Sequence, residues 1–346
     1  MKRTRFIAYT VFMFAVAMAC YLRPSPDDFD RYVYEAIVRS AKQPIEQIYP
    51  IVKHESPRAE SSSVMDSPGH LAQLEPLYAI RPIYIEIADA LSRAGLAPQS
   101  AINAISAASL FFIGMLVYQL TGNDLYSALL ICTPNVVTLG RLGGPDALSS
   151  LVVVSGCMAV LRKQVFLGIL LLMVSIWVRT DNVLICLSVL AWLCWRRELK
   201  PSHAALLGLL ASASVEWINR LSGNYGWKVL LRYSFVSGRY PADITSGITF
   251  VQYVRVFLLN AESLVPQLAI WVFLGIVTWK LNSSERGLLT AVAIACGLHY
   301  ALFPSGEDRY FAWACLISGI LFVRVLLARM RKLPTAGGMV VHTAAA

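Results

Sequence analysis

Long apolar segments alternate with short polar ones along most of the chain. The apolar segments cover residues 6–22, 101–120, 125–139, 147–161, 165–178, 183–195, 204–218, 264–279, 288–303 and 310–327. A helix needs about 20 apolar residues to cross a bilayer core, so the shorter segments must tilt or borrow flanking polar residues. The pattern predicts an all-α polytopic membrane protein with about ten transmembrane helices, the count lying between eight and eleven.

Two longer polar segments interrupt this alternation, at residues 23–100 and 220–262. Within the first, 31–41 and 80–91 have apolar residues at helical spacing, which predicts amphipathic helices along the membrane surface. The Ser-, Pro- and charge-rich stretch 55–69 predicts a mobile loop, with His54 and His70 in the flexible part. The second segment is rich in aromatic and basic residues, including Trp227 and Tyr233, and is expected to cover a bound lipid. We expect a single transmembrane domain over 1–330 and a short cytoplasmic tail over 331–346.

The composition supports lipid as the solvent of much of the chain. It is 57% hydrophobic and 15% charged, whereas soluble domains have about 45–50% apolar and about 25% charged residues. The net charge of +9 lies in short basic clusters between apolar segments, which is typical of membrane loops and does not indicate nucleic acid as a partner. The seven cysteines form no CxxC or Cys/His cluster, so neither a zinc site nor a disulfide framework is expected.

The first apolar segment has two interpretations. A basic start at Lys2, Arg3 and Arg5 followed by uncharged residues is typical of a signal peptide, and Ala17-Met18-Ala19 resembles a cleavage site. The alternative is a retained first span. We favour retention, because a retained span makes the distribution of basic residues agree with an alternating topology.

Basic residues predict the orientation. With the N-terminus in the cytoplasm and ten alternating spans, the cytoplasmic loops hold Arg162 and Lys163, then Arg196, Arg197 and Lys200, then Lys280 and Arg286, and the C-terminal side holds Arg329, Arg331 and Lys332. Only the loop at 122–124 lacks a basic residue. The positive-inside rule therefore predicts that both termini are cytoplasmic, in a protein of the bacterial inner membrane.

The same topology places five segments with acids and arginines on the outer side. They are 27–32, 141–146, 179–182, 220–262 and 306–310. Ionisable groups packed at the ends of spans are costly to desolvate and are functional candidates. We therefore expect these segments to converge on one polar site.

Such a site suits a lipid-phosphate substrate. A carboxylate after the first span can act as a general base toward an acceptor hydroxyl, and arginines from other segments can hold a phosphate by charge-assisted hydrogen bonds. Glycosyl transfer from a lipid phosphate uses both groups, because positive charge stabilises the leaving phosphate while the sugar passes through an oxocarbenium-like state.

Several short motifs resemble the GT-C glycosyltransferases, and more narrowly their ArnT-like and protein O-mannosyltransferase-like branches. The motifs are Pro26-Asp27-Asp28-Phe29-Asp30-Arg31-Tyr32 with Glu35, Gly140-Arg141 with Pro145-Asp146-Ala147-Leu148, Arg179-Thr180-Asp181, and Glu307-Asp308-Arg309-Tyr310-Phe311. The resemblance implies a polyprenyl-phosphate-sugar donor and an aspartate of the first outer segment as the catalytic base. The second acid of the family motif is usually Glu, whereas Asp28 follows Asp27 here, so Asp28, Asp27 and Asp30 all remain candidates, in that order.

The remaining candidate site residues would bind phosphate or substrate. They are Arg141, Arg179, Arg309, Arg81, Tyr32, Asp146, Asp181, Glu307, Asp308 and His299. We expect no cofactor and no metal, although neighbouring aspartates are of the kind that binds Mg²⁺ or Mn²⁺. The expected partners are a lipid-linked sugar donor, a glycan, lipid or protein acceptor, and membrane lipids, with no nucleic acid.

Two other functions remain open. An O-antigen-type polysaccharide polymerase or ligase also has about ten spans and outer arginines, but its large outer loop usually comes late in the chain. A transporter or flippase would show internal repeats and ionisable residues at mid-membrane; the sequence shows no clear repeat, and charges are nearly absent from the centres of the apolar segments.

Overall fold

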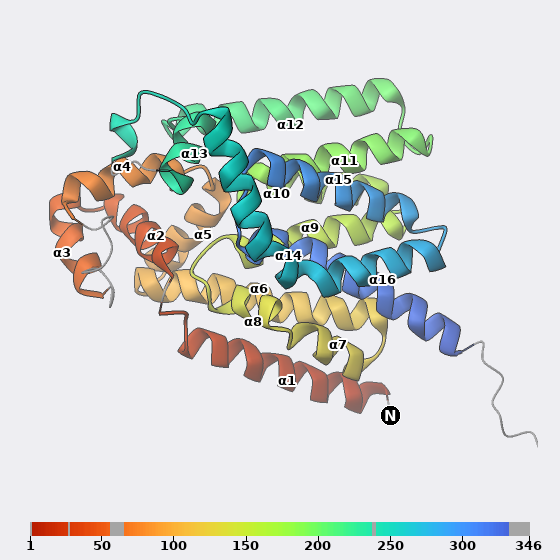
Figure 1. Cartoon of the computed structure of the whole chain (residues 1–346). Helices are drawn as coiled ribbons and strands as arrows, with labels where there is room; N and C mark the ends of the chain where they lie inside the picture. The colour runs from red at the N-terminus through yellow and green to blue at the C-terminus, as the bar shows by residue number, and fades with distance from the viewer. Residues whose placement is uncertain (1, 27, 56–65, 237–239, 332–346) are drawn as a thin grey trace, which may run out of the picture.

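The computed structural model describes residues 2–26, 28–55, 66–236 and 240–331. All regular secondary structure in these ranges is helical, which confirms the predicted all-α class. In chain order (Figure 1) the elements are α1 (Lys2–Leu22), α2 (Phe29–Ser40), α3 (Ile45–Glu55), α4 (Pro68–Tyr78), α5 (Pro82–Arg93), α6 (Pro98–Thr121), α7 (Asp124–Ile131), α8 (Pro134–Arg141), α9 (Asp146–Leu161), α10 (Val165–Val178), η2 (Thr180–Asn182), α11 (Val183–Trp195), α12 (Pro201–Leu221), α13 (Trp227–Phe235), η3 (Pro241–Asp243), α14 (Phe250–Leu281), α15 (Arg286–Leu302), η4 (Asp308–Phe311) and α16 (Ala312–Met330).

The long helices lie side by side and alternate in direction. Figure 1 shows α1, α6, α9, α10, α11 and α12 running roughly parallel to one another, with α15 and α16 beside them. The start of α1 and the end of α16 lie at one end of the bundle, which we call the terminal end. Helices α2–α5 and α13 cover the opposite end, which we call the capped end. The predicted alternation of spans therefore agrees with the path of the chain.

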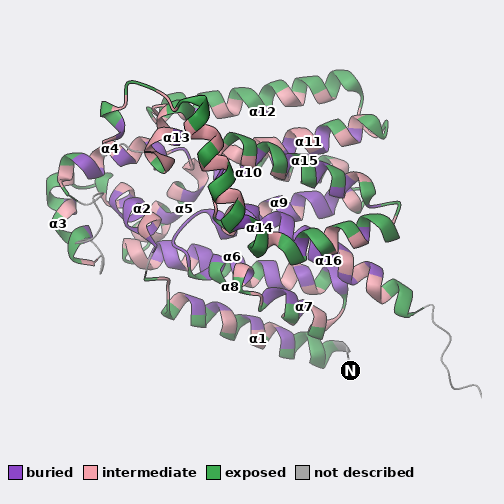
Figure 2. Cartoon of the chain, viewed as in Figure 1, coloured by how far each residue is buried: buried purple, intermediate pink, exposed green. Residues whose placement is uncertain are grey.

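The outside of the bundle is apolar, as expected for a membrane protein. Exposed fractions reach 62% for Val11, 69% for Leu209 and 59% for Phe273, and exposed residues run along the outer sides of α1, α12 and α14 in Figure 2. In water, such continuous apolar surface would drive association. Lipid contact explains why these side chains lie on the surface.

Four helices of the described chain are long and apolar enough to cross a membrane. They are Arg3–Leu22, Pro98–Thr121, Phe250–Leu281 and Asp308–Met330, and shorter apolar helices cover Asp146–Leu161, Val165–Val178, Thr180–Trp195 and Arg286–Leu302. All ten predicted apolar segments are helical, but 125–139 is split between α7 and α8. Pro134 begins α8, and a proline cannot continue the preceding helix because it lacks an N–H. The number of membrane crossings stays a prediction.

Helix α14 is longer than the predicted span 264–279. It begins at Phe250, behind a capping box in which Thr249 and Gln252 satisfy each other's backbone N–H groups. The helix changes direction along its length in Figure 1, and Pro266 inside it removes one backbone hydrogen bond. Its first part therefore crosses the capped end, where the sequence predicted a loop.

Close packing of α9 on α10 depends on two glycines. A Cβ atom on Gly168 would lie 2.8 Å from the carbonyl oxygen of Gly156, and one on Gly156 would lie 3.1 Å from that of Gly168. Small residues let helix backbones approach in membranes, where packing drives association. This pair therefore allows α9 and α10 to pack backbone against backbone.

The described parts of segment 23–100 are more helical than predicted. The expected surface helices correspond to α2 and α5, but Pro68 and Gly69, placed in a loop by the sequence, open helix α4 behind the N-cap Ser67. The prediction that His70 is flexible is wrong, because its side chain is fully buried and its ring lies 4.5 Å from the Tyr240 ring. Asp27, the middle of the predicted loop (56–65) and the tail residues 332–346 lie outside the described residues.

Candidate functional site

A cavity of about 330 Å³ lies at the capped end of the bundle. Its polar wall comes from segments that are far apart in the chain: Asp30 at the start of α2, Tyr78 and Arg81 around the α4–α5 junction, Arg179, Thr180 and Asp181 at η2, Ser234 on α13, His299 in the last turn of α15, and Tyr310 in η4. Leucines and aromatic rings, including Trp227 and Tyr233 of α13, form the rest of the wall. The structure therefore brings together most of the charged outer segments that the sequence singled out.

A continuous chain of ion pairs runs behind and along this wall. Asp30 Oδ2 lies 2.8 Å from Arg309 Nη1, and the same nitrogen lies 3.7 Å from Asp146 Oδ2. Asp146 also pairs with Arg179, which in turn binds Asp181 through two nitrogens, at 3.0 Å and 2.6 Å. Asp146 is thus shared by two arginines and joins α9 to both η2 and η4.

His299 and Tyr310 complete this network. His299 Nδ1 lies 3.3 Å from Asp181 Oδ2. The Tyr310 ring contacts two guanidinium groups, with its centroid 4.9 Å from the Arg179 Cζ and 5.2 Å from the Arg309 Cζ. Such cation–π contacts strengthen when the groups are desolvated. Tyr310 therefore keeps two like charges in place at the start of α16.

Arg81 is the cation of the cavity that lacks a carboxylate partner among the described residues. Its Nη1 donates to the Leu77 carbonyl at 2.9 Å, and its guanidinium lies over the Tyr78 and Tyr34 rings at 5.4 Å and 5.8 Å. Arg179 and Arg309, in contrast, are each matched by more than one acid. An anion entering the cavity would find at Arg81 a guanidinium that is free of a direct ion pair with the described residues, although the charges of Asp30 and Asp181 act on it through space.

The two described aspartates of the first segment have different surroundings. Asp30 lines the cavity and accepts a hydrogen bond from the Tyr78 hydroxyl at 2.7 Å. Asp28 is 3% exposed, does not line the cavity, and accepts the backbone N–H of Gly143. Asp28 therefore holds the 141–146 loop against α2, while Asp30 faces the space where a ligand would lie.

Their pKa values shift in opposite directions. Burial raises the pKa of Asp28 to about 6, the charge of Asp30 adds to this rise, and the Gly143 N–H opposes it. Burial also acts to raise the pKa of Asp30, but the Arg309 charge and the Tyr78 hydrogen bond outweigh it and lower the pKa below its usual value. At neutral pH Asp30 is thus an anion held by a cation.

Other predicted site residues lie away from the cavity. Arg141 is exposed at the end of α8 and donates to the Arg23 carbonyl at 2.9 Å, which fastens α8 to the end of α1. Tyr32 is buried between α2, α3 and α4 and accepts a hydrogen bond from Arg31 at 2.8 Å. Glu307 pairs with Arg309, and Asp308 begins η4 without lining the cavity.

Sequence reasoning missed Tyr78, the hydrogen-bond partner of Asp30. Its only sequence signal is its position at the end of an apolar helix, three residues before Arg81. Glu35, part of the acidic motif, points elsewhere: it is fully buried and pairs with Arg39 at 2.6 Å. Burial and a hydrogen bond with Glu55 raise the pKa of Glu35 to about 7.

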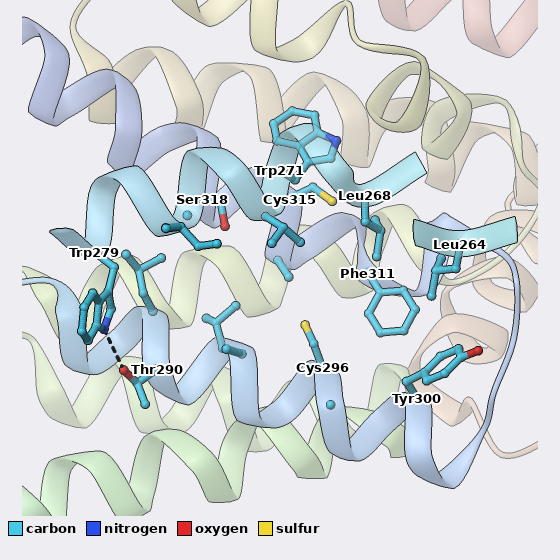
Figure 3. A pocket seen from close by; sticks show the side chains of 18 residues that line it. Leu264, Leu268, Trp271, Trp279, Thr290, Cys296, Tyr300, Phe311, Cys315 and Ser318 are labelled. Atoms are coloured by element: carbon cyan, nitrogen blue, oxygen red, sulfur yellow. Dashed lines mark hydrogen bonds between the residues drawn. The ribbon is translucent and has the colours of Figure 1, made fainter. Parts of the chain in front are cut away.

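An apolar cavity of about 460 Å³ lies beside the polar one, between α14, α15 and α16. In Figure 3, Leu264 and Leu268 of α14 lie across it from Cys296 and Tyr300 of α15, and Trp271 of α14 also lines it. The neighbouring residues Tyr310 and Phe311 line the polar and the apolar cavity respectively. A ligand with an anionic head and an apolar tail would match this pair of cavities.

Within the described residues, no group of three or more His, Cys, Asp or Glu side chains could hold a metal ion. The chain was also compared with known protein families, with curated proteins and with solved structures, and none of these comparisons found a match.

Proposed function

We propose that this membrane protein is a glycosyltransferase that moves a sugar from a polyprenyl-phosphate donor to a hydroxyl acceptor at the extracytoplasmic face. The observation that carries the proposal is that Asp30, Arg81 and Arg179 line one cavity, directly beside an apolar cavity between helices. The motif resemblance to GT-C enzymes points to the same chemistry.

Arg81 is the proposed ligand of the donor phosphate. Its guanidinium is held from behind by a backbone carbonyl and by two tyrosine rings, and it has no carboxylate partner among the described residues. Charge on the phosphate oxygens increases as the sugar–phosphate bond breaks, so a fixed guanidinium stabilises the transition state more than the ground state. Arg179 would add a second positive charge near the phosphate, a charge that Asp146 and Asp181 already balance in part.

Asp30 is the proposed proton acceptor. Its Oδ1 accepts the Tyr78 hydroxyl at 2.7 Å, and an acceptor hydroxyl taking that position would be placed for proton transfer. The pairing with Arg309 keeps the carboxylate ionised but makes it a weak base. Proton transfer would then follow departure of the phosphate, when the acceptor oxygen is already bonding to an oxocarbenium-like carbon.

The apolar cavity would hold the first isoprene units of the donor. Its wall is formed by leucine, tryptophan and phenylalanine side chains of α14, α15 and η4. His299 faces the polar cavity, whereas Cys296 and Tyr300, on the same helix, face the apolar one. The last turn of α15 therefore separates the proposed headgroup site from the proposed tail site.

The test is sugar transfer by the purified full chain in bilayers supplied with a polyprenyl-phosphate-sugar pool. Arg81→Gln is expected to reduce turnover by about 10²–10³-fold, as for loss of a preorganised transition-state donor. Arg93→Gln is the matched control, because Arg93 lies on α5 with its side chain 60% exposed and pairs with Asp89 at the surface. Full turnover in Arg81→Gln, or no transfer by the unmodified chain from any pool, would contradict the proposal and favour a polymerase, a ligase or a transporter instead.

A further inference from the structure

A second polar cavity lies at the terminal end of the bundle, opposite the candidate site. Its volume is about 810 Å³, and it lies between the end of α11, the end of α14 and the start of α15. Arg196, Arg286, Ser283, Ser284 and three tryptophans form its polar part. Trp279 also lines the apolar cavity between α14, α15 and α16, whereas Arg196, Arg286, Ser283 and Ser284 line neither that cavity nor the polar cavity at the capped end.

Positive charge at this cavity exceeds negative charge. Arg286 donates to the carbonyls of Trp279 and Lys280, at 2.7 Å and 3.3 Å, and has no carboxylate partner among the described residues. Arg196 lies 3.1 Å from Glu198, but the same carboxylate oxygen also binds Lys163 at 2.8 Å. One acid therefore serves two cations, while Arg286 remains uncompensated.

The other acid nearby is already paired. Glu285, next to Arg286 in the chain, lies 3.7 Å from Arg324 of α16. The backbone N–H groups at the start of α15 add a partial positive charge at the same place. Anion binding is thus favoured by two guanidinium groups and a helix N-terminus together.

Tryptophan side chains indicate the depth of this cavity in the membrane. The Arg196 guanidinium lies 5.6 Å from the Trp192 ring, and that of Arg286 lies 5.0 Å from the Trp279 ring. Trp195 is 88% exposed. Tryptophan is enriched at the headgroup level of membranes, so these arginines lie where lipid phosphates lie.

The remaining wall of the cavity is apolar and continues onto the outer surface. Leu187 on α11 and Ile294 and Leu298 on α15 line it toward the middle of the bundle. Ile294 and Leu298 are 52% and 47% exposed. A free phosphate or a soluble anion would leave this wall uncovered, whereas acyl chains would cover it.

We propose that this cavity binds one anionic glycerophospholipid, with the headgroup phosphate at Arg196 and Arg286 and the acyl chains along Leu187, Ile294 and Leu298. Basic cavities between helices near a membrane surface select anionic headgroups by charge. The proposal needs only the membrane character of the chain and is independent of the transferase activity.

The probe is phosphatidylglycerol added to the purified full chain in detergent, with bound lipid counted by native mass spectrometry. The unmodified chain is expected to retain one phosphatidylglycerol at least tenfold more strongly than phosphatidylcholine. The double variant R196Q/R286Q should lose this preference. The matched control R162Q/R329Q removes the same charge at the same end from residues that do not line the cavity, and should keep it.

A second variant separates the apolar wall from the charge. Ile294→Trp is expected to fill the cavity and to lower phosphatidylglycerol retention about tenfold without changing net charge, while circular dichroism stays unchanged. Equal loss in R162Q/R329Q would show general surface attraction and overturn the proposal. Equal retention of phosphatidylcholine, or saturation of the site by glycerol phosphate alone, would overturn it as well.

Discussion

The Asp30 carboxylate of α2 and the Arg309 guanidinium of η4 lie 2.8 Å apart, although 278 residues separate them in the chain. Their side chains are 21% and 14% exposed. The pair joins α2 to η4, and Asp30 lines the polar cavity. It therefore ties the shape of the candidate site to the stability of the capped end.

Arg309→Ala is expected to lower the free energy of unfolding by at most about 3–5 kcal/mol, the range for a fully buried pair, because the buried Asp146 and the partly buried Asp30 lose a counter-charge. Asp30, Asp146 and Glu307 all lose a partner in this variant. Chemical unfolding in detergent, followed by circular dichroism, measures the effect. Arg93→Ala, which removes an exposed pair, should change stability by about 0–1 kcal/mol; a similar loss in both variants would contradict the role given to Arg309.

Much of the site could be predicted because charged groups that flank apolar helices must lie at the ends of the bundle, outside the apolar core of the membrane. Arg179 follows α10 directly, and Arg309 lies in η4 just before α16, so both lie at one end of the bundle. The sequence also places the basic clusters at 162–163, 196–200 and 280–286 at the opposite end. The placement of the segments that carry Asp30, Arg179 and Arg309 at one end of the bundle follows from topology alone.

The face of each helix could not be predicted from the same pattern. Asp28 and Asp30 are two residues apart, and the start of α2 at Phe29 decides which of them reaches the cavity. Arg141 lies at a helix end like the others, yet its side chain reaches back to the Arg23 carbonyl. These outcomes depend on side-chain packing between distant segments, which no local spacing encodes.

The raised pKa of Asp28 predicts a pH dependence of stability. A carboxyl whose pKa rises from 3.8 to about 6 on folding holds its proton more tightly in the folded state. Stability therefore falls as pH rises from about 4 to about 6, and the loss persists above pH 6. Asp28→Asn keeps an acceptor for the Gly143 N–H without the charge. The difference in unfolding free energy between this variant and the unmodified chain should therefore increase, in favour of the variant, as pH rises from about 4 to about 6.

The gain should approach about 3 kcal/mol at pH 7, taking two pKa units at 1.36 kcal/mol each as the upper bound. Denaturant unfolding at pH 4 and at pH 7 measures it. Asp30→Asn should behave oppositely, because the lowered pKa of Asp30 means that its stabilising effect is lost only at acid pH, below 3.8. If the unfolding free energies of the Asp28→Asn variant and the unmodified chain depend on pH in the same way, the pKa of Asp28 is not raised by folding.

Glycine-to-alanine substitution is expected to destabilise the chain at the α9–α10 contact and to stabilise it at an open position in α15. Gly168→Ala places a Cβ 2.4 Å from a Val160 methyl and 2.8 Å from the Gly156 carbonyl oxygen, so it should destabilise the chain by about 1–3 kcal/mol. Gly297→Ala meets nothing within 4 Å in α15 and should stabilise it by up to about 1 kcal/mol through helix propensity. Thermal unfolding of both variants in detergent tests the pair, and a stable Gly168→Ala protein would rule out the close approach.

Asp30→Asn is expected to reduce sugar transfer by about 10²–10⁴-fold, because the amide cannot accept a proton. Donor binding should be retained, since Arg81 and Arg179 stay in place. Tyr78→Phe should have a much smaller effect, because the acceptor hydroxyl takes the position of the Tyr78 hydroxyl at Oδ1. Turnover and donor affinity are measured separately, in bilayers containing a polyprenyl-phosphate-sugar pool.

Asp146→Asn is the matched control for this test. Asp146 is also an aspartate paired with Arg309, at 3.7 Å, but it does not line the cavity. If Asp30 accepts the proton, Asp146→Asn should reduce turnover far less than Asp30→Asn at equal folded fraction. Equal losses would mean that both variants act by releasing arginines of the ion-pair network, since Asp146 holds Arg179 as well as Arg309. Near-normal transfer in Asp30→Asn would move the base to Asp28 or Asp27, whose Asn variants should then show the full loss instead.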